Sequence, residues 1–322
     1  MKAAVYYETG SPDVFRYEDV PDPQPGPGEL LIAVEAVSIE GGDTLNRLGG
    51  EMTARPHIVG YQAAGTVLEI GEGVDRIAVG DRVVTVGLNG SHAEKRVAAQ
   101  TFAWTIPDGL ATNEAACIPV PFGTAHDCLF EFGRMQPGET VLIHAGAGGV
   151  GTAAIQMAKH AGARVLATAS SDERLERLKP LGLDDGINYA IHDFVEECRR
   201  LTDGRGADVI VDSIGGSNLQ RSLAALAYRG RCITVGDASR TAGEALDASS
   251  LRGNNQSLTG YFLGAELFLG TRAYQLVADQ IDAVASGTLK VVIDRTFPLA
   301  DAADAHHYIE SRQAFGRVLL IP

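Results

Sequence analysis

One segment of the sequence limits the possible folds more than any other: VLIHAGAGGVGTAAIQMAKHAGARVLATAS, from Val141 to Ser170. A short apolar strand is predicted to end at His144, and the glycines of a G-x-G-x-x-G pattern follow it. A helix is then predicted over residues 151–161 and a second strand over residues 164–168. Strand, glycine loop, helix and strand within about 30 residues are typical of a βαβ unit that binds a dinucleotide.

Each glycine of the pattern has a separate task in such a unit. Gly146 permits the tight turn, Gly148 lets a phosphate approach the backbone, and Gly151 lets the helix pack closely on the strand. The N-terminus of the helix offers free N–H groups and a positive dipole end to the pyrophosphate. The candidate cofactor ligands in this loop are Gly146, Ala147, Gly148, Gly149, Val150 and Gly151. The alternative interpretation is a glycine-rich turn without a ligand.

Strands and helices alternate around this segment, whereas the two ends of the chain are rich in strands. Helices at 173–181, 194–201 and 219–227 alternate with strands at 187–189, 208–212, 231–235 and 257–263, which predicts an α/β fold with a doubly wound parallel sheet. β-prone runs stand before it, at 2–7, 29–37, 63–70 and 82–86, and after it, at 291–297 and 317–321. A chain of 322 residues favours two domains. We expect a nucleotide-binding domain of residues 121–265 inserted into a β-rich domain of residues 1–120 and 266–322.

The end of the second strand of the βαβ unit bears on which dinucleotide is bound. Enzymes that use NAD usually place an acidic residue there to hold the ribose 2′-OH. Here the strand ends in serines, and Asp172 and Glu173 come only afterwards. Ser170 and Ser171 can donate hydrogen bonds to a 2′-phosphate and Arg174 adds a planar cation, which favours NADPH. The alternative is that Ser171 caps the following helix and Arg174 is a solvated charge.

Charge and composition are typical of an ordinary soluble globular protein of the cytosol. The net charge of −14 argues against general binding to nucleic acid or to an anionic membrane. The four cysteines form no C-x-x-C pair and are typical of reduced thiols in the cytosol. The N-terminal residues contain no apolar signal core, and no clean apolar run reaches the roughly 20 residues of a membrane span.

Several longer motifs carry a resemblance to a known family. VEAVSIEGGD, PHIVGYQAAGTVLEIGEGVDRIAVGDRVV, IPVPFGTAHDCLF, AGAGGVGTAAIQMAKHAGARVLATASSDERLERLKPLG and ESRQAFGRVLLIP together resemble the medium-chain dehydrogenase/reductase superfamily. Within it they are most similar to the zinc-free, zeta-crystallin-like quinone oxidoreductases. The resemblance covers the whole chain. It implies a GroES-like substrate domain in two sequence pieces, a Rossmann domain between them, and a homodimer joined through the last Rossmann strands, here about Ser257 to Leu263.

The resemblance also implies further contacts to NADPH. A basic residue after the second strand, a tyrosine after the third and an arginine near the C-terminus hold the 2′-phosphate in that branch, and they match Arg174, Tyr189 and Arg312. Loops at the carboxyl ends of later strands are expected to line the cofactor groove, because ligands bind there in open parallel sheets. These loops contribute Ser213, Val235 and Gly236. Tyr261 and Phe262 would either cover the nicotinamide or pack a dimer edge.

The positions that bind catalytic zinc in other members of the superfamily hold different residues here. Glu40, Tyr61, Gln62 and about Val120 stand where the zinc ligands would be. Catalytic zinc normally has three protein ligands drawn from Cys, His and carboxylate. A single carboxylate with a tyrosine and an amide does not provide that set, so we expect no metal.

Without a metal, hydrogen-bond donors must polarise the substrate. The candidate catalytic residues are Tyr61, Glu40, Gln62 and Thr124, with Tyr61 as donor to the substrate carbonyl and Thr124 as a positioner of the nicotinamide. Tyr61 could instead be an aromatic wall of the site. Glu40 departs from the asparagine that is common in quinone reductases. It could relay a proton, accept a substrate hydrogen bond, or pair with Arg47.

The sequence as a whole predicts an NADPH-dependent, zinc-independent oxidoreductase that transfers hydride to a quinone. The first alternative is an enoyl or 2-alkenal reductase acting on activated C=C bonds, because the same fold and cofactor would serve. The second is an NADPH-binding protein without enzymatic activity.

Overall fold

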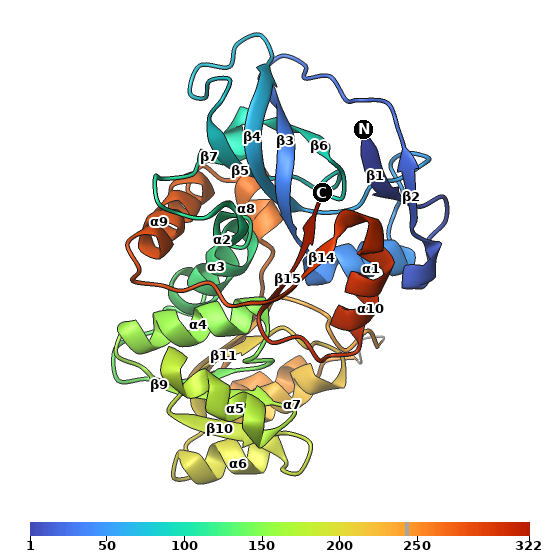
Figure 1. Cartoon of the computed structure of the whole chain (residues 1–322). Coiled ribbons are helices and arrows are strands. Elements are labelled where there is room, and N and C mark those ends of the chain that lie inside the picture. Colours follow the sequence, from blue (N-terminus) through green and yellow to red (C-terminus); the bar gives the residue numbers. More distant parts are fainter. Residues whose placement is uncertain (242–244) are drawn as a thin grey trace. The chain divides into compact units, whose positions relative to one another are not determined.

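The computed structural model describes residues 1–241 and 245–322 (Figure 1). These residues divide into two compact units. The central unit is Thr124–Leu263, and the β-rich unit combines Met1–Gly123 with Gly264–Pro322.

The central unit is built on a parallel sheet of six strands in the order β10-β9-β8-β11-β12-β13. The strands are β8 (Thr140–Ile143), β9 (Arg164–Ala169), β10 (Asp185–Asn188), β11 (Ala207–Asp212), β12 (Leu226–Thr234) and β13 (Ser257–Gly260). Numbered along the chain, this is the order 3-2-1-4-5-6 of the Rossmann fold. The predicted doubly wound α/β sheet is therefore confirmed. In such a sheet, ligands bind outside the carboxyl ends of the strands, where the strand order reverses beside β8.

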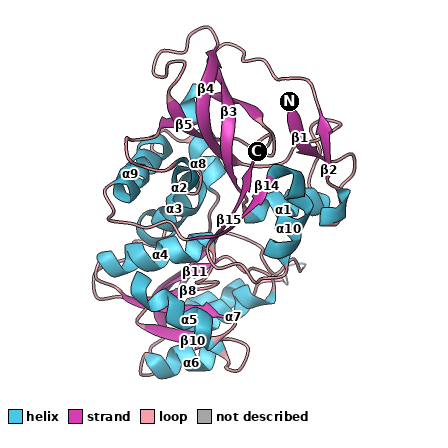
Figure 2. Cartoon of the chain, in the orientation of Figure 1, coloured by secondary structure: helices cyan, strands magenta, loops and turns pink. Residues whose placement is uncertain are grey.

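Four helices connect the first five strands of this sheet. They are α4 (Gly149–His160), α5 (Asp172–Leu178), α6 (Phe194–Leu201) and α7 (Ser217–Ala225). Both α4 and α5 contact the short turn Lys179–Leu181, whereas α6 packs against α7. Right-handed crossovers place these two pairs on opposite faces of the sheet, so its strands are covered on both sides (Figure 2). This explains why the strands are apolar runs without alternation, as at the fully buried Leu142, Leu166 and Ile210.

The β-rich unit contains a seven-stranded sheet and a separate antiparallel pair of strands, β1 and β2. Most of the large sheet follows the path β14-β15-β3-β4-β5-β7, and β6 also pairs with β3. The two sequence pieces of the β-rich unit thus share one sheet, because β15 near the C-terminus pairs antiparallel with β3. The strands are β1 (Lys2–Val5), β2 (Arg16–Asp19), β3 (Glu29–Ser38), β4 (Gln62–Ile70), β5 (Arg82–Val86), β6 (Lys95–Ala99), β7 (Ala103–Thr105), β14 (Ile293–Pro298) and β15 (Arg317–Ile321).

Helices join or flank these strands. They are α1 (Gly41–Gly49), α2 (Thr112–Ala115), α3 (Pro119–His126), α8 (Leu263–Leu269), α9 (Ala273–Ala285) and α10 (Ala302–Glu310). Helix α3 contains the boundary between the two units and continues into a π-helical turn at Asp127–Glu131. None of the described helices is long and apolar enough to cross a membrane.

The structure differs from the sequence-based prediction at the end of β13. A strand was expected over residues 257–263, but β13 ends at Gly260 and α8 begins at Leu263. The chain turns because Tyr261 is buried, with its ring 5.1 Å from that of Phe132 and its hydroxyl donating to Asp127 Oδ2 at 2.9 Å. The predicted dimer segment of residues 257–263 is thus a strand only over its first four residues.

Candidate functional site

The glycine loop of the central unit connects β8 to α4. Gly148 is the N-cap of α4, and Gly146 N donates to Thr168 O at 2.9 Å. A Cβ atom at Gly151 would lie 2.4 Å from Ala145 O, which is far too close, so this glycine is required for the helix to pack on the loop. A Cβ at Gly148 would meet only Ala145 O, at 3.3 Å. This contact is slightly closer than ordinary van der Waals distance, but no other atom lies within 4 Å, so the backbone at Gly148 leaves room for the close approach of a phosphate.

These two glycines give a matched test of the loop. We expect Gly151→Ala to lower both thermal stability and dinucleotide affinity, because its Cβ has no room. Gly148→Ala should lower the melting temperature much less than Gly151→Ala does but weaken dinucleotide binding by about tenfold or more, because its Cβ occupies the phosphate's space. Calorimetric titration and thermal unfolding measure the two effects. Unchanged affinity in Gly148→Ala would contradict a diphosphate site at this backbone.

The adjacent ends of β9 and β10 carry four of the five residues that were predicted to bind the 2′-phosphate, namely Ser170, Ser171, Arg174 and Tyr189. Asn188 in β10 pairs with Ala169 in β9, and Tyr189 N donates to Ala169 O at 3.1 Å. Tyr189 is 45% exposed. Ser171 is the N-cap of α5, and its Oγ accepts from Arg174 N at 3.3 Å. The capping role is therefore present, and the hydroxyl hydrogen of Ser171 is still able to donate. Ser170 precedes this cap.

The loops after β11 and β12 also lie side by side at this edge of the sheet. Val235 N donates to Asp212 O at 2.9 Å, and Ala238 N donates to Ser213 O at 3.1 Å. A Cβ at Gly236 would lie 3.0 Å from Ser213 O. Ser213, Val235 and Gly236 are thus placed where the fold binds its ligand, and their contact with a cofactor stays a prediction. Phe262 is 55% exposed, unlike its buried neighbour Tyr261.

The β-rich unit contains a buried polar cluster around Glu40. Arg317 forms an ion pair with the Glu40 carboxylate and also donates to Ser38 Oγ at 2.7 Å and to Ile39 O at 2.6 Å. Gln62 Nε2 donates to Glu40 Oε1, and Gln62 Oε1 accepts from Val120 N at 3.0 Å. The pairing of β15 with the end of β3 brings Arg317 to this place.

The proposed pairing of Glu40 with Arg47 is wrong. Arg47 is fully buried elsewhere, where it donates to Gly10 O and forms an ion pair with Glu310. The reason is that Arg47 lies near the C-terminal end of α1, whereas Glu40 is the residue before its first turn. Arg317 takes the position of the counterion instead.

A second carboxylate connects Glu40 with Tyr61. Asp43 Oδ2 accepts from Glu40 N at 2.8 Å, and Asp43 Oδ1 accepts from Tyr61 N at 3.1 Å. The phenol oxygen of Tyr61 accepts from Asn46 Nδ2 at 3.1 Å. This arrangement fixes the Tyr61 backbone and fills one acceptor position of its oxygen, which leaves the hydroxyl hydrogen available to a further acceptor.

Burial dominates the protonation of this cluster. It raises the pKa of Glu40 to about 7, although Arg317 and the hydrogen bonds act in the opposite direction. It raises the pKa of Asp43 to about 8, against the hydrogen bond from Glu40 N. Burial also raises the pKa of Tyr61 above its ordinary value. Two carboxyl groups that hold protons near neutral pH are unusual, and such groups are typical of sites that handle protons.

Three members of this cluster were not among the residues predicted from the sequence: Asp43, Asn46 and Arg317. The spacing of Glu40 and Asp43 at the start of α1 is the signal that could have found Asp43, because a residue at the third helical position often bonds back to the N-cap. Arg317 gives no local signal.

Two further residues that were predicted from the sequence lie outside this hydrogen-bonded set. Thr124 is only 5% exposed, on α3. Arg312 follows α10 in the β-rich unit, with a positive φ of 59°.

The residues of this cluster do not fit a catalytic zinc site. The carboxylate of Glu40 is occupied by a guanidinium and an amide, and Gln62 uses both ends of its amide within the protein. Residues 1–241 and 245–322 hold no group of three or more His, Cys, Asp or Glu side chains arranged for a metal. Zinc independence stays a prediction that elemental analysis can test.

Comparisons with known proteins agree with this geometry. Residues 26–108 match the family described as "Alcohol dehydrogenase GroES-like domain", and residues 149–283 match "Zinc-binding dehydrogenase". The chain is 35% identical to a 2-haloacrylate reductase of Burkholderia sp over 339 residues, covering 100% of this chain and 99% of that protein.

Solved structures give the same result. The quinone oxidoreductase of Pseudomonas syringae pv. Tomato DC3000 superposes with a TM-score of 0.94 at 32% identity, covering 100% of this chain and 99% of that one. The Escherichia coli quinone oxidoreductase complexed with NADPH also gives 0.94, at 28% identity over 100% of both chains. The chain belongs to the medium-chain dehydrogenase/reductase superfamily, within its quinone oxidoreductase branch. It is an oxidoreductase with a GroES-like domain and a Rossmann domain.

Proposed function

We propose that the protein reduces a small electron-poor acceptor, a quinone in the first place, with NADPH as the reductant. The observation that carries this proposal is the glycine loop at the N-terminus of α4, whose backbone at Gly148 is open to a phosphate. Serines and an arginine follow β9 where an NAD enzyme would carry an acid. The NADPH complex of the Escherichia coli relative supports the same cofactor.

The cofactor, when bound, supplies a hydride ion, that is one proton with two electrons, so the protein must stabilise the negative charge that develops on the acceptor oxygen. Tyr61 is suited to this task. Its raised pKa keeps the proton on the phenol, and Asn46 Nδ2 fills an acceptor position of the oxygen at 3.1 Å. The O–H group of Tyr61 donates to the carbonyl of the acceptor. The start of β4, next to Tyr61, is held by hydrogen bonds from Val120 N to Gln62 and from Tyr61 N to Asp43.

An activated alkene is the second candidate acceptor, since the 35% identical relative is a 2-haloacrylate reductase. An alkene conjugated to a carbonyl uses the same donor to its oxygen and accepts hydride at carbon. Rates of NADPH oxidation with 1,4-benzoquinone, an enone and an enoyl thioester decide between the two. Turnover of the quinone supports the first proposal, and activity with the alkenes alone replaces it by the second.

Cofactor preference is expected to depend on Arg174. The change Arg174→Ala should weaken NADPH binding by about tenfold to a hundredfold, because a charge-assisted hydrogen bond to the 2′-phosphate is lost. Binding of NADH, which lacks that phosphate, should stay unchanged. Calorimetric titration of both cofactors tests this. An equal loss for NADPH and NADH would show that Arg174 does not read the phosphate.

The acidity of Glu40 predicts a pH effect on turnover. With its pKa raised to about 7, Glu40 keeps its proton below that pH and loses it above. If it supplies a proton during turnover, kcat falls with rising pH above about 7, and Glu40→Gln removes this dependence. Arg317 keeps its contacts to Ser38 and Ile39 in this variant, so the cluster should stay folded. A pH profile of kcat that is the same in both proteins would exclude the proton role.

We further propose a cellular location and an oligomeric state. The protein is cytoplasmic and forms a homodimer through β13, which is the edge strand in the order of the central sheet. Size-exclusion chromatography with light scattering measures the mass in solution, and a monomer would contradict the dimer.

A further inference from the structure

A buried chain of hydrogen bonds runs across the carboxyl ends of three strands of the central sheet. It begins at Asp212 at the end of β11 and passes through Ser222 of α7 to His144, the residue after β8. From His144 it continues to Thr168 of β9 and ends on Ala145 N, the first peptide of the glycine loop. All of the participating side chains are at most 3% exposed.

The direction of the hydrogen bonds is fixed at the Asp212 end. Asp212 Oδ1 accepts from Ile214 N at 2.8 Å and Gly215 N at 3.0 Å. Its Oδ2 accepts from Asn218 Nδ2 at 3.1 Å and lies 2.7 Å from Ser222 Oγ. Four donors around two oxygens suit a carboxylate, which only accepts.

Ser222 therefore has to accept a hydrogen bond from His144. Its single hydroxyl hydrogen is directed to Asp212 Oδ2 at 2.7 Å or to the carbonyl oxygen of Asn218 at 3.1 Å, and both are acceptors. The contact of 3.0 Å from Ser222 Oγ to His144 Nε2 is then made by a proton on Nε2.

The same logic determines the other side of the imidazole ring. Burial lowers the pKa of His144 below its ordinary value, so the ring is neutral at pH 7 and Nδ1 carries no proton. Thr168 Oγ1, 3.2 Å away, donates to Nδ1. Its oxygen is then turned to accept from Ala145 N at 3.3 Å. The ring itself is held edge-on against Phe194, with centroids 4.7 Å apart.

Ala145 is the residue on which the shape of the loop depends. Its φ of 49° lies in the left-handed region, which a residue with a Cβ adopts only when its surroundings hold it there. Its carbonyl accepts from Gly148 N at 2.8 Å and is the atom against which Gly151 packs. A contact that holds the Ala145 peptide therefore sets the position of the Gly148 backbone.

We propose that His144, Thr168 and Ser222 are positioning residues of the dinucleotide site, which hold the Ala145 peptide and so shape the glycine loop for the diphosphate before the cofactor arrives. The inference rests on the proposed binding of NADPH at this loop. None of the three side chains needs to touch the cofactor. The same chain of hydrogen bonds ties the glycine loop to the Ile214–Gly215 backbone after β11, so both loops are fixed together.

The test removes one hydroxyl without changing the shape of the side chain. Thr168→Val should raise the Kd of NADPH about tenfold, the effect of one lost positioning hydrogen bond. The Kd of NADH should rise by the same factor, because both cofactors share the diphosphate. The value of kcat at saturating NADPH should stay within about twofold of wild type. Thr168→Ser keeps the hydroxyl and should restore the affinity.

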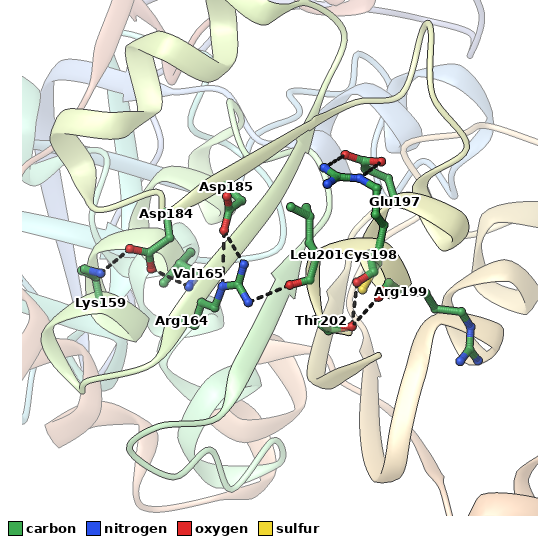
Figure 3. A network of polar contacts seen from close by, with 11 residues as sticks. Lys159, Arg164, Val165, Asp184, Asp185, Glu197, Cys198, Arg199, Leu201 and Thr202 are labelled. Atoms are coloured by element: carbon green, nitrogen blue, oxygen red, sulfur yellow. Dashed lines mark hydrogen bonds and ion pairs between the residues drawn. The ribbon is translucent and has the colours of Figure 1, made fainter. Parts of the chain in front are cut away.

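Thr202 is a matched control residue, which lies before the amino end of a strand of the same sheet. Thr202 is fully buried and donates to Cys198 O at 2.7 Å (Figure 3). It also accepts from Gly206 N at 2.9 Å. It lies between α6 and β11, before the amino end of β11, whereas the glycine loop follows the carboxyl end of β8. Thr202→Val should lose stability as Thr168→Val does, yet bind NADPH with wild-type affinity. Equal losses of affinity in both variants would reduce the proposal to a general effect of stability.

Nitrogen-15 NMR of the imidazole ring gives an independent readout. The wild-type protein without cofactor should show His144 neutral and protonated at Nε2, and a proton on Nδ1 would overturn the proposal. Wild-type affinity in Thr168→Val would also overturn it, while leaving the proposed function intact. A wild-type protein that binds neither nucleotide would instead overturn the proposed function, and the inference with it.

Discussion

Above pH 7, where Glu40 is ionised, replacing Arg317 with methionine is expected to lower the free energy of unfolding by about 3–5 kcal/mol, the usual result of removing one partner of a buried ion pair. Glu40 is 5% exposed and Arg317 is 7% exposed, so the carboxylate left behind cannot recover its hydration. Of the two side chains that contact the Glu40 carboxylate, only Gln62 would remain as its partner. The protein would respond by protonating Glu40, which makes the loss smaller at low pH than at high pH.

The loss can be measured specifically in the β-rich unit. The single tryptophan, Trp104 of β7, is 2% exposed there, so its fluorescence during urea unfolding reports on this unit. In the double variant Glu40→Gln with Arg317→Met both charges are gone, and most of the stability should return. Lys2→Met, which breaks an exposed pair with Asp19 in the same unit, should leave the midpoint nearly unchanged. A stable Arg317→Met single variant would mean that Glu40 is not a buried carboxylate.

Replacing Tyr61 with phenylalanine is expected to lower kcat by about 100-fold or more, the typical loss when a donor to a developing oxyanion is removed. The ring remains, so a role as an aromatic wall would be preserved. The KM for NADPH should change little, since the diphosphate and 2′-phosphate contacts belong to other residues. This separates the two roles that the sequence left open for Tyr61.

The control for this variant is Tyr228→Phe, which removes a hydroxyl from a side chain that is 65% exposed. It should have wild-type kinetics. Initial rates with 1,4-benzoquinone, measured by the loss of NADPH absorbance, give kcat and KM for both proteins. Wild-type kcat in Tyr61→Phe would leave Tyr61 as a wall of the site and move the donor role to another residue.

The central unit could be predicted from the sequence because its signals are local. Strand, glycine loop and helix follow one another within Val141–His160, and the close contact that requires Gly151 lies within the same segment. The end of β13 was predicted wrongly, since the burial of Tyr261 depends on Asp127 at a distance of 134 residues along the chain. Apolar character alone does not distinguish a strand from such a turn.

The polar cluster of the β-rich unit could be predicted only in part, for the same reason. Glu40, Tyr61 and Gln62 were found because they occupy known positions of the family motifs. Arg317 is 277 residues from Glu40 and becomes its counterion through the pairing of β15 with β3. A helix at α1 was also missed, because glycine at both of its first positions and at its last gives poor helix propensity. The bonds around Asp43 compensate for it.

We propose that the backbone at the start of α4 receives the diphosphate of a pyridine nucleotide without the help of a metal ion. Calorimetric titration of the metal-analysed wild-type protein with NADPH and NADH tests it most directly. We expect one site per chain, tighter binding of NADPH than of NADH, and far less than one zinc per chain. Heat from neither nucleotide, or one equivalent of zinc that scatters anomalously beside Glu40, would contradict it.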